Sequence, residues 1–123
     1  MNRKAIGDRA EQLACDYLQR CGLQLLQRNF RCRGGEIDLI MQHHDSLVFV
    51  EVRYRRRTAW GRAAETVSPD KQSRLIRCAQ HYINRYRQWN TAARFDVVSI
   101  EGEPGAIQLE WISDAFAADS QNR

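Results

Sequence analysis

Three strand-like segments follow one another in the first half of the chain, with only short turns between them. They cover residues 23–31, 36–42 and 47–54. The first turn contains the pair Gly34-Gly35, which favours a tight reversal, and turns this short connect antiparallel strands. The third segment begins Leu-Val-Phe-Val-Glu-Val, the most β-prone stretch of the sequence. The sequence therefore predicts an antiparallel three-stranded meander.

A helix is predicted on each side of this meander. Residues 6–21 place apolar side chains at helical spacing and are followed by Gly22, a common helix stop. Later in the chain Ser68 is a good N-cap and Pro69 suits the first helical position. We expect this second helix to run to about Trp89, with its apolar stripe buried against the sheet.

Two more strands are expected at 95–100 and 107–112. Asp96, near the start of the first, is expected to make structural hydrogen bonds rather than to act in catalysis. The element order is α-β-β-β-α-β-β, which indicates an α/β fold with a mixed sheet flanked by helices. We expect a single domain over 1–118 and a frayed tail over 119–123.

The second turn determines which side chains of the meander oppose each other. If Gln42 pairs with Leu47 across the turn formed by residues 43–46, Asp38 faces Glu51. By the same pairing Glu36 faces Arg53. Side chains two residues apart share a face of a strand, so all four project from one face. Opposed side chains have Cβ atoms ~4.5–5.5 Å apart, where two carboxylates repel each other.

A hard divalent cation between the two acids would relieve this repulsion, because Mg²⁺ and Mn²⁺ prefer oxygen ligands. Two alternatives remain. Arg53 or a neighbouring arginine could bridge both acids in an ion-pair network, or a register slip of one residue could separate them. A third carboxylate, Glu11, lies at the edge of the apolar stripe of the first helix, where the helix meets the core.

Basic residues are concentrated after the third strand. Five arginines and no acid lie between Arg53 and Arg62, with aromatic residues interleaved, and only Lys4 and Lys71 among the 19 basic residues are lysines. Arginine binds phosphate through two hydrogen bonds and stacks on bases, so this pattern suits nucleic acid. A solvated loop with a basic bias would explain the pattern equally well.

We expect a cytoplasmic protein without membrane association. The sequence starts with no signal-like apolar run, and its longest apolar stretch, 47–50, is far shorter than the ~20 residues that span a bilayer. The cysteines show no metal-binding spacing and are expected to be reduced, buried thiols, with disulfides as the less favoured alternative: Cys15, Cys21, Cys32 and Cys78.

The stretches 35–40 (Gly-Glu-Ile-Asp-Leu-Ile) and 48–53 (Val-Phe-Val-Glu-Val-Arg) resemble the YraN-like family of uncharacterised bacterial proteins. The stretches 7–11, 95–98 and 112–116 also fit the pattern of that family, so the resemblance covers nearly the whole chain. The family is similar to the restriction-endonuclease-like (PD-(D/E)xK) nucleases, particularly archaeal Holliday junction resolvases. The resemblance therefore implies a restriction-endonuclease-like core.

The resemblance also implies a metal site with a role for each residue. Asp38 and Glu51 would bind Mg²⁺ or Mn²⁺, together with the backbone carbonyl of Val52. Glu11 would hold a metal-bound water. The metal would polarise the scissile phosphate and activate the attacking water. Arg53 occupies the position of the motif's lysine.

Arginine at that position changes what the site can do. Its pKa lies above ~12, so Arg53 can hydrogen-bond a water or stabilise phosphoryl charge but cannot act as a base. Either the metal alone activates the water, or Lys71 reaches the site from the second helix as a catalytic residue, or activity is weak or absent. An exposed position near the helix start is the simpler interpretation of Lys71.

The leading hypothesis is a nucleic-acid-binding protein that acts as a Mg²⁺-dependent DNA endonuclease. We expect it to select branched or damaged DNA, because phosphate contacts carry no sequence information. A Holliday-junction substrate would require a homodimer. The alternatives are a non-catalytic nucleic-acid-binding module, which Arg53 favours, and an accessory protein that binds a repair or recombination partner. The expected phosphate contacts are Arg55, Arg56, Arg57, Arg62, Arg74 and Arg77.

Overall fold

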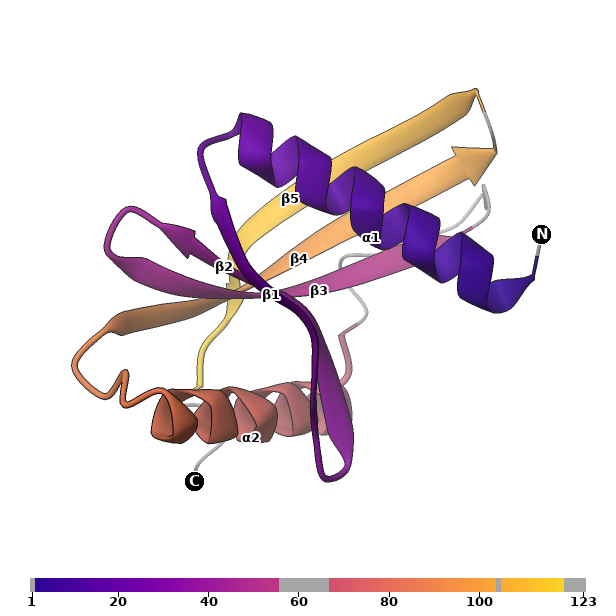
Figure 1. Ribbon diagram of the computed structural model, residues 1–123. Coiled ribbons are helices and arrows are strands. Elements are labelled where there is room, and N and C mark those ends of the chain that lie inside the picture. Colours follow the sequence, from indigo (N-terminus) through magenta and orange to yellow (C-terminus); the bar gives the residue numbers. More distant parts are fainter. Residues whose placement is uncertain (1, 56–66, 104, 119–123) are drawn as a thin grey trace.

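The computed structural model describes residues 2–55, 67–103 and 105–118 (Figure 1). The predicted order α-β-β-β-α-β-β is confirmed. The predicted tail 119–123 lies outside the described residues, as do Arg56, Arg57 and Arg62. The elements are α1 (Arg3–Arg20), β1 (Gln24–Cys32), β2 (Gly35–His43), β3 (Ser46–Arg55), α2 (Pro69–Arg85), β4 (Ala92–Glu103) and β5 (Ala106–Phe116).

The five strands form one mixed sheet in the order β1-β2-β3-β4-β5. The strands β3 and β4 are parallel, and every other neighbouring pair is antiparallel. A parallel pair needs a crossover between its strands, and the segment that contains α2 provides it. Helix α1 covers one face of the sheet and α2 covers the other (Figure 1). The predicted mixed sheet flanked by helices is therefore confirmed.

The central strand β3 contributes to a core on each face of the sheet. Val48 and Val50 pack in the core beneath α1, whereas Leu47 and Phe49 pack in the core beneath α2. A strand covered on both faces has no polar side, which explains its nearly continuous apolar sequence. Because side chains alternate along a strand, Glu51 points to the same side as Leu47 and Phe49, which is the face of the sheet that α2 covers.

The end of α2 differs from the prediction. The helix ends at Arg85, about one turn before Trp89, a residue that is 62% exposed. Arg87 adopts a left-handed conformation with φ 56°, which a continuing helix cannot accommodate. In α1 the predicted stop is confirmed, with Gly22 at φ 99°. In the described parts of the chain, neither helix combines the length and apolarity that crossing a bilayer requires.

The expectation of four reduced, buried thiols is wrong for three of the cysteines. Cys32 and Cys78 form a disulfide that joins the β1–β2 hairpin to α2, and Cys21 is free but exposed. Only Cys15 is a free, buried thiol as predicted. The two bonded residues are 46 positions apart with Cα atoms 5.5 Å apart. Docking of α2 on the hairpin creates this proximity, and no local pattern reveals it.

Candidate functional site

The β2–β3 hairpin has the register that turn geometry predicts. The residues that flank the turn pair as expected, and the ladder continues to Leu39 opposite Val50. Beyond that pair the described ladder stops. The Asp38 carboxylate Oδ2 accepts a hydrogen bond of 2.8 Å from the backbone N–H of Val52. A side chain therefore takes the place of a backbone acceptor where the two strands part.

This change affects the two predicted pairs of the hairpin differently. Asp38 and Glu51 remain neighbours, and a hydrogen bond links their carboxyl groups. The ladder ends before it reaches Glu36 and Arg53, so their predicted pairing is not part of it. Glu36 lies instead next to β1, with Arg31 Nε 3.7 Å from its Oε2.

Carboxylates from α1 and β2 converge beside this hairpin. One oxygen each of Glu11, Glu36 and Asp38 lies within 4.8 Å of the other two. Glu11 is half-buried at the boundary between α1 and the sheet, as its place on the helical stripe predicted. Glu51 extends the group from β3 through its contact with Asp38. Four carboxyl groups on three elements thus offer the oxygen ligands that a hard divalent cation prefers.

The electrostatics of the cluster favour the protonated forms of Asp38 and Glu11. Burial, followed by the charge of Glu51, raises the pKa of Asp38 to about 8. Burial, followed by the charges of Glu36 and Asp8, raises the pKa of Glu11 above its usual value. Near neutral pH Asp38 therefore carries a proton. Binding of a cation would displace that proton.

Lys71 reaches this site from the first turn of α2. Its Nζ lies 2.8 Å from Oε2 of Glu51, whose side chain is only 7% exposed, whereas the lysine side chain is 44% exposed. Ser68 caps the helix by accepting a hydrogen bond from the backbone N–H of Lys71. The sequence left two placements open for Lys71, one at the acids and one exposed near the start of the helix. The structure shows Lys71 at the acids. The ammonium group compensates the charge of a buried carboxylate.

A cavity of about 250 Å³ opens at the acids. Arg74 lies on its wall, and Arg77 is exposed one turn further along α2. Arg55 is half-buried at the end of β3 and is not part of the cavity lining. Among the described arginines predicted to contact phosphate, Arg74 is thus the one beside the acids. The lining residues are Gly35, Glu36, Asp38, Glu51, Val52, Lys71, Arg74 and Leu75.

Sequence reasoning missed two residues of this site. Glu36 shares a strand face with Asp38, a signal that was available but was interpreted as pairing with Arg53. Asn29 on β1 lies between two acids, in the amide orientation that satisfies both. Its nitrogen donates to Glu36 Oε1 at 2.8 Å and to Glu11 Oε1 at 3.1 Å. No sequence signal indicates this contact, because it depends on the convergence of three elements.

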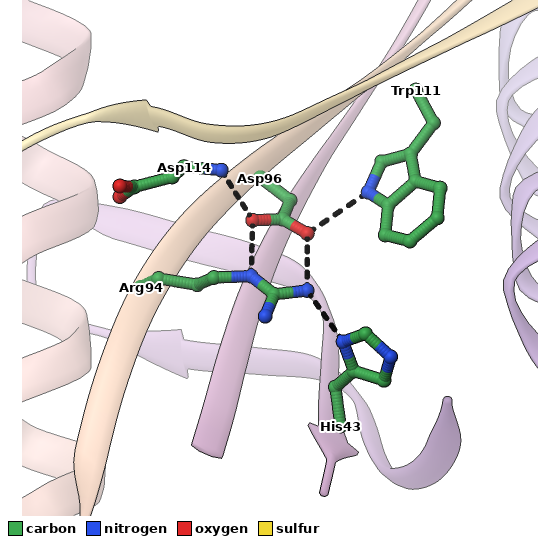
Figure 2. Close-up of polar contacts among 5 residues, drawn as sticks. All are labelled: His43, Arg94, Asp96, Trp111 and Asp114. Atoms are coloured by element: carbon green, nitrogen blue, oxygen red, sulfur yellow. Dashed lines mark hydrogen bonds and ion pairs between the residues drawn. The ribbon is translucent and has the colours of Figure 1, made fainter. Parts of the chain in front are cut away.

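A second polar cluster, around Asp96, is structural (Figure 2). The buried Asp96 carboxylate accepts hydrogen bonds from Arg94, from Trp111 Nε1 at 2.9 Å and from the Asp114 backbone N–H at 2.9 Å. Arg94 Nη2 lies 3.0 Å from His43 Nδ1 (Figure 2). The cluster ties β5 to β4 where their register shifts. The predicted structural role of Asp96 is confirmed.

Comparisons with known proteins place the chain in a family. Residues 10–100 match the model of "Uncharacterised protein family UPF0102". The chain is 55% identical over 115 residues to a UPF0102 protein of Nitrosococcus oceani, covering 93% of each chain. It is 48% identical to a UPF0102 protein of Pseudomonas syringae pv. syringae, covering 93% of this chain and 94% of the relative. It is 45% identical to the UPF0102 protein VV0603 of Vibrio vulnificus, covering 94% of each. The chain therefore belongs to the UPF0102 family, the YraN-like family that its sequence pattern predicted.

Proposed function

We propose that this protein is a Mg²⁺- or Mn²⁺-dependent DNA endonuclease that selects branched or damaged DNA. The observation that carries the proposal is the convergence of acids from α1, β2 and β3, of which those of β2 and β3 line a polar cavity with a lysine of α2 beside them. Asp38 and Glu51 would bind the cation, with the Val52 carbonyl as a further ligand. A bound cation supplies Lewis-acid polarisation of a phosphoryl oxygen and lowers the pKa of water.

The residues around the acids have distinct proposed roles. Glu11 orients a water through its carboxylate. Lys71 is paired with Glu51 and can stabilise phosphoryl charge or, once deprotonated, accept a proton. Arg53 can stabilise charge but cannot accept a proton. Arg74 on the cavity wall would bind a backbone phosphate, a contact that positions any sequence equally well.

A non-catalytic nucleic-acid-binding protein is the second candidate. Two observations favour it. Arg53 replaces the lysine of the nuclease motif, and the ammonium of Lys71 lies where it competes with a cation for Glu51. Such a protein would use the same basic residues to bind phosphates without turnover.

Titration calorimetry with Mn²⁺ and Mg²⁺ tests the metal site. We expect the wild type to bind at millimolar cation or below. Loss of an outer-shell partner costs a metal site about 10–100-fold in affinity, so removal of a ligand in Asp38→Ala or Glu51→Ala should cost about 100-fold or more. Asp45→Ala, at an exposed turn position, is the matched control and should bind like the wild type. A wild type that binds neither cation at millimolar concentration would refute the proposal.

Cleavage assays on branched, single-stranded and duplex DNA then separate the two candidates. With Mg²⁺ present we expect the wild type to cut branched DNA, and Arg53→Lys to cut faster with unchanged cation affinity, because lysine can orient and deprotonate water. Cation binding without any cleavage, by either form, would favour the non-catalytic alternative.

The salt dependence of DNA binding tests the phosphate contact of Arg74. Each phosphate contact contributes about 0.9 to the slope of log affinity against log salt concentration. We expect Arg74→Ala to reduce the slope by about that amount and to weaken binding to all sequences alike. Arg20→Ala, at the last turn of α1, is the control. An unchanged slope in Arg74→Ala would mean that Arg74 does not contact a DNA phosphate.

A further inference from the structure

Asn29 lies where α1, β1 and β2 meet. Pairing of β1 with β2 on both sides of this residue places it opposite Asp38. Its φ of 51° is in the left-handed region, which asparagine tolerates better than most residues with a side chain. Two separate properties of Asn29 therefore require explanation: a backbone conformation that glycine would adopt freely, and a side-chain amide directed at the acids.

The amide is suited to hold two carboxylates together. An amide nitrogen carries two hydrogens, and here one is donated to Glu11 and the other to Glu36. These acids belong to different elements and are 25 positions apart, so no local interaction determines their separation. A neutral donor brings them together without adding a positive charge. A lysine in its place would compete with a cation, and an aspartate would add a further repelling charge.

We propose that Asn29 is a positioning residue of the cation site, which sets the spacing of Glu11 and Glu36 so that Glu36 can bind the cation together with Asp38 while Glu11 holds a cation-bound water. The inference rests on the proposed function and deepens it, because it adds Glu36 to the ligand set and assigns a support to Glu11. The three acids already lie within 4.8 Å of one another, and Asn29 contacts two of them.

The variant Asn29→Gly removes the side-chain amide but keeps a residue that adopts the left-handed backbone conformation. It therefore tests the role of the side chain alone. Glycine adopts the left-handed conformation without steric strain, and relief of that strain offsets part of the cost of the lost amide hydrogen bonds, so the melting temperature should change little. Loss of the amide should weaken Mn²⁺ binding about 10–100-fold in calorimetry, the usual cost of removing an outer-shell partner. The control His44→Gly relaxes another left-handed residue, φ 55°, at the turn of the same hairpin as Asp38. It should leave Mn²⁺ affinity unchanged.

The variant Asn29→Asp gives a second, independent measurement. It keeps the size of the side chain and the tolerance for the left-handed conformation but replaces the donor with a carboxylate. In the presence of a chelator its melting temperature should fall below that of the wild type, and saturating Mn²⁺ should restore most of the difference.

The outcomes distinguish this inference from the proposed function. Wild-type Mn²⁺ affinity in Asn29→Gly, or an unchanged melting temperature and affinity in Asn29→Asp, would overturn the positioning role and leave the metal site of Asp38 and Glu51 intact. A wild type that binds no Mn²⁺ would overturn both.

Discussion

Replacing Asp38 with asparagine is expected to make the protein more stable at high pH when no divalent cation is present. Burial and then the charge of Glu51 raise the pKa of Asp38 from 3.8 to about 8, so the folded protein holds this proton after the unfolded chain has lost it. The stability that this group contributes is therefore lost as the pH rises through that interval. Between pH 5 and pH 9 the wild type should lose about 4 kcal/mol through this group.

The asparagine variant should not show this loss. Its side-chain oxygen can still accept the hydrogen bond from Val52, and it carries no charge to repel Glu51. Chemical unfolding at a series of pH values, with a chelator present, measures the effect. Asp45→Asn in the exposed turn is the control and should follow the wild-type curve. Parallel curves for the wild type and Asp38→Asn would show that Asp38 ionises normally in the folded protein.

The same experiment with Mg²⁺ connects stability to function. If Asp38 binds the cation, Mg²⁺ should restore the wild-type stability at pH 9, because a ligand that binds only the folded state stabilises it. Asp38→Asn should not respond. A trade-off of this kind is expected at binding sites, where groups are held in arrangements that cost stability until the ligand is present.

Replacing Lys71 with methionine is expected to destabilise the protein at pH 7 by about 2–4 kcal/mol. Glu51 is buried and its Oε2 lies 2.8 Å from the lysine ammonium. Removing one partner of a buried ion pair costs ~3–5 kcal/mol, because it leaves the other charge uncompensated, and the partial exposure of Lys71 reduces this cost. Denaturant unfolding in the presence of a chelator is the measurement.

A double-mutant cycle attributes the loss to the ion pair. In Lys71→Met with Glu51→Gln most of the stability should return, giving a coupling free energy of about 1–3 kcal/mol between the two sites. Lys4→Met is the matched control, because Lys4 pairs with Asp8 on the surface, and should cost less than about 1 kcal/mol. Equal losses in the single variant and the double variant would mean that Lys71 acts through packing alone.

The affinity of Lys71→Met for Mg²⁺ is a second measurement on this variant. Without its ammonium group, residue 71 no longer competes with the cation for the Glu51 carboxylate. Lys71→Met should therefore bind Mg²⁺ more tightly than the wild type, yet cleave DNA more slowly if the lysine acts in catalysis. Tighter binding with unchanged cleavage would leave Lys71 as a counter-ion for Glu51 and nothing more.

Local patterns in the sequence predicted most of the fold. β-prone segments and short turns predicted the meander, and the apolar run of β3 predicted its third strand. The cap at Ser68 predicted the start of α2. The end of α2 was not predictable, because it depends on the left-handed conformation of Arg87 rather than on residue periodicity.

The sequence by itself determined which side chains share a face. Strand alternation and the length of the β2–β3 turn were sufficient to make Asp38 and Glu51 neighbours, because side-chain direction and register are local properties of a hairpin. The insertion of the Asp38 carboxylate at Val52, which ended the ladder before Glu36, depended on how the strands part and was not available from turn length.

Only the tertiary structure decided which elements meet at those acids. Docking of α1 brought Glu11 to β2, docking of α2 brought Lys71 to Glu51 and Cys78 to Cys32, and the path of β1 placed Asn29 between two acids. Helical periodicity indicates which face of a helix is buried, but the rotation and translation of that helix on the sheet follow from packing of the whole core. The opposed acids of the hairpin are therefore a property of the local sequence, whereas the cavity with its lysine and its amide is a property of the packed molecule.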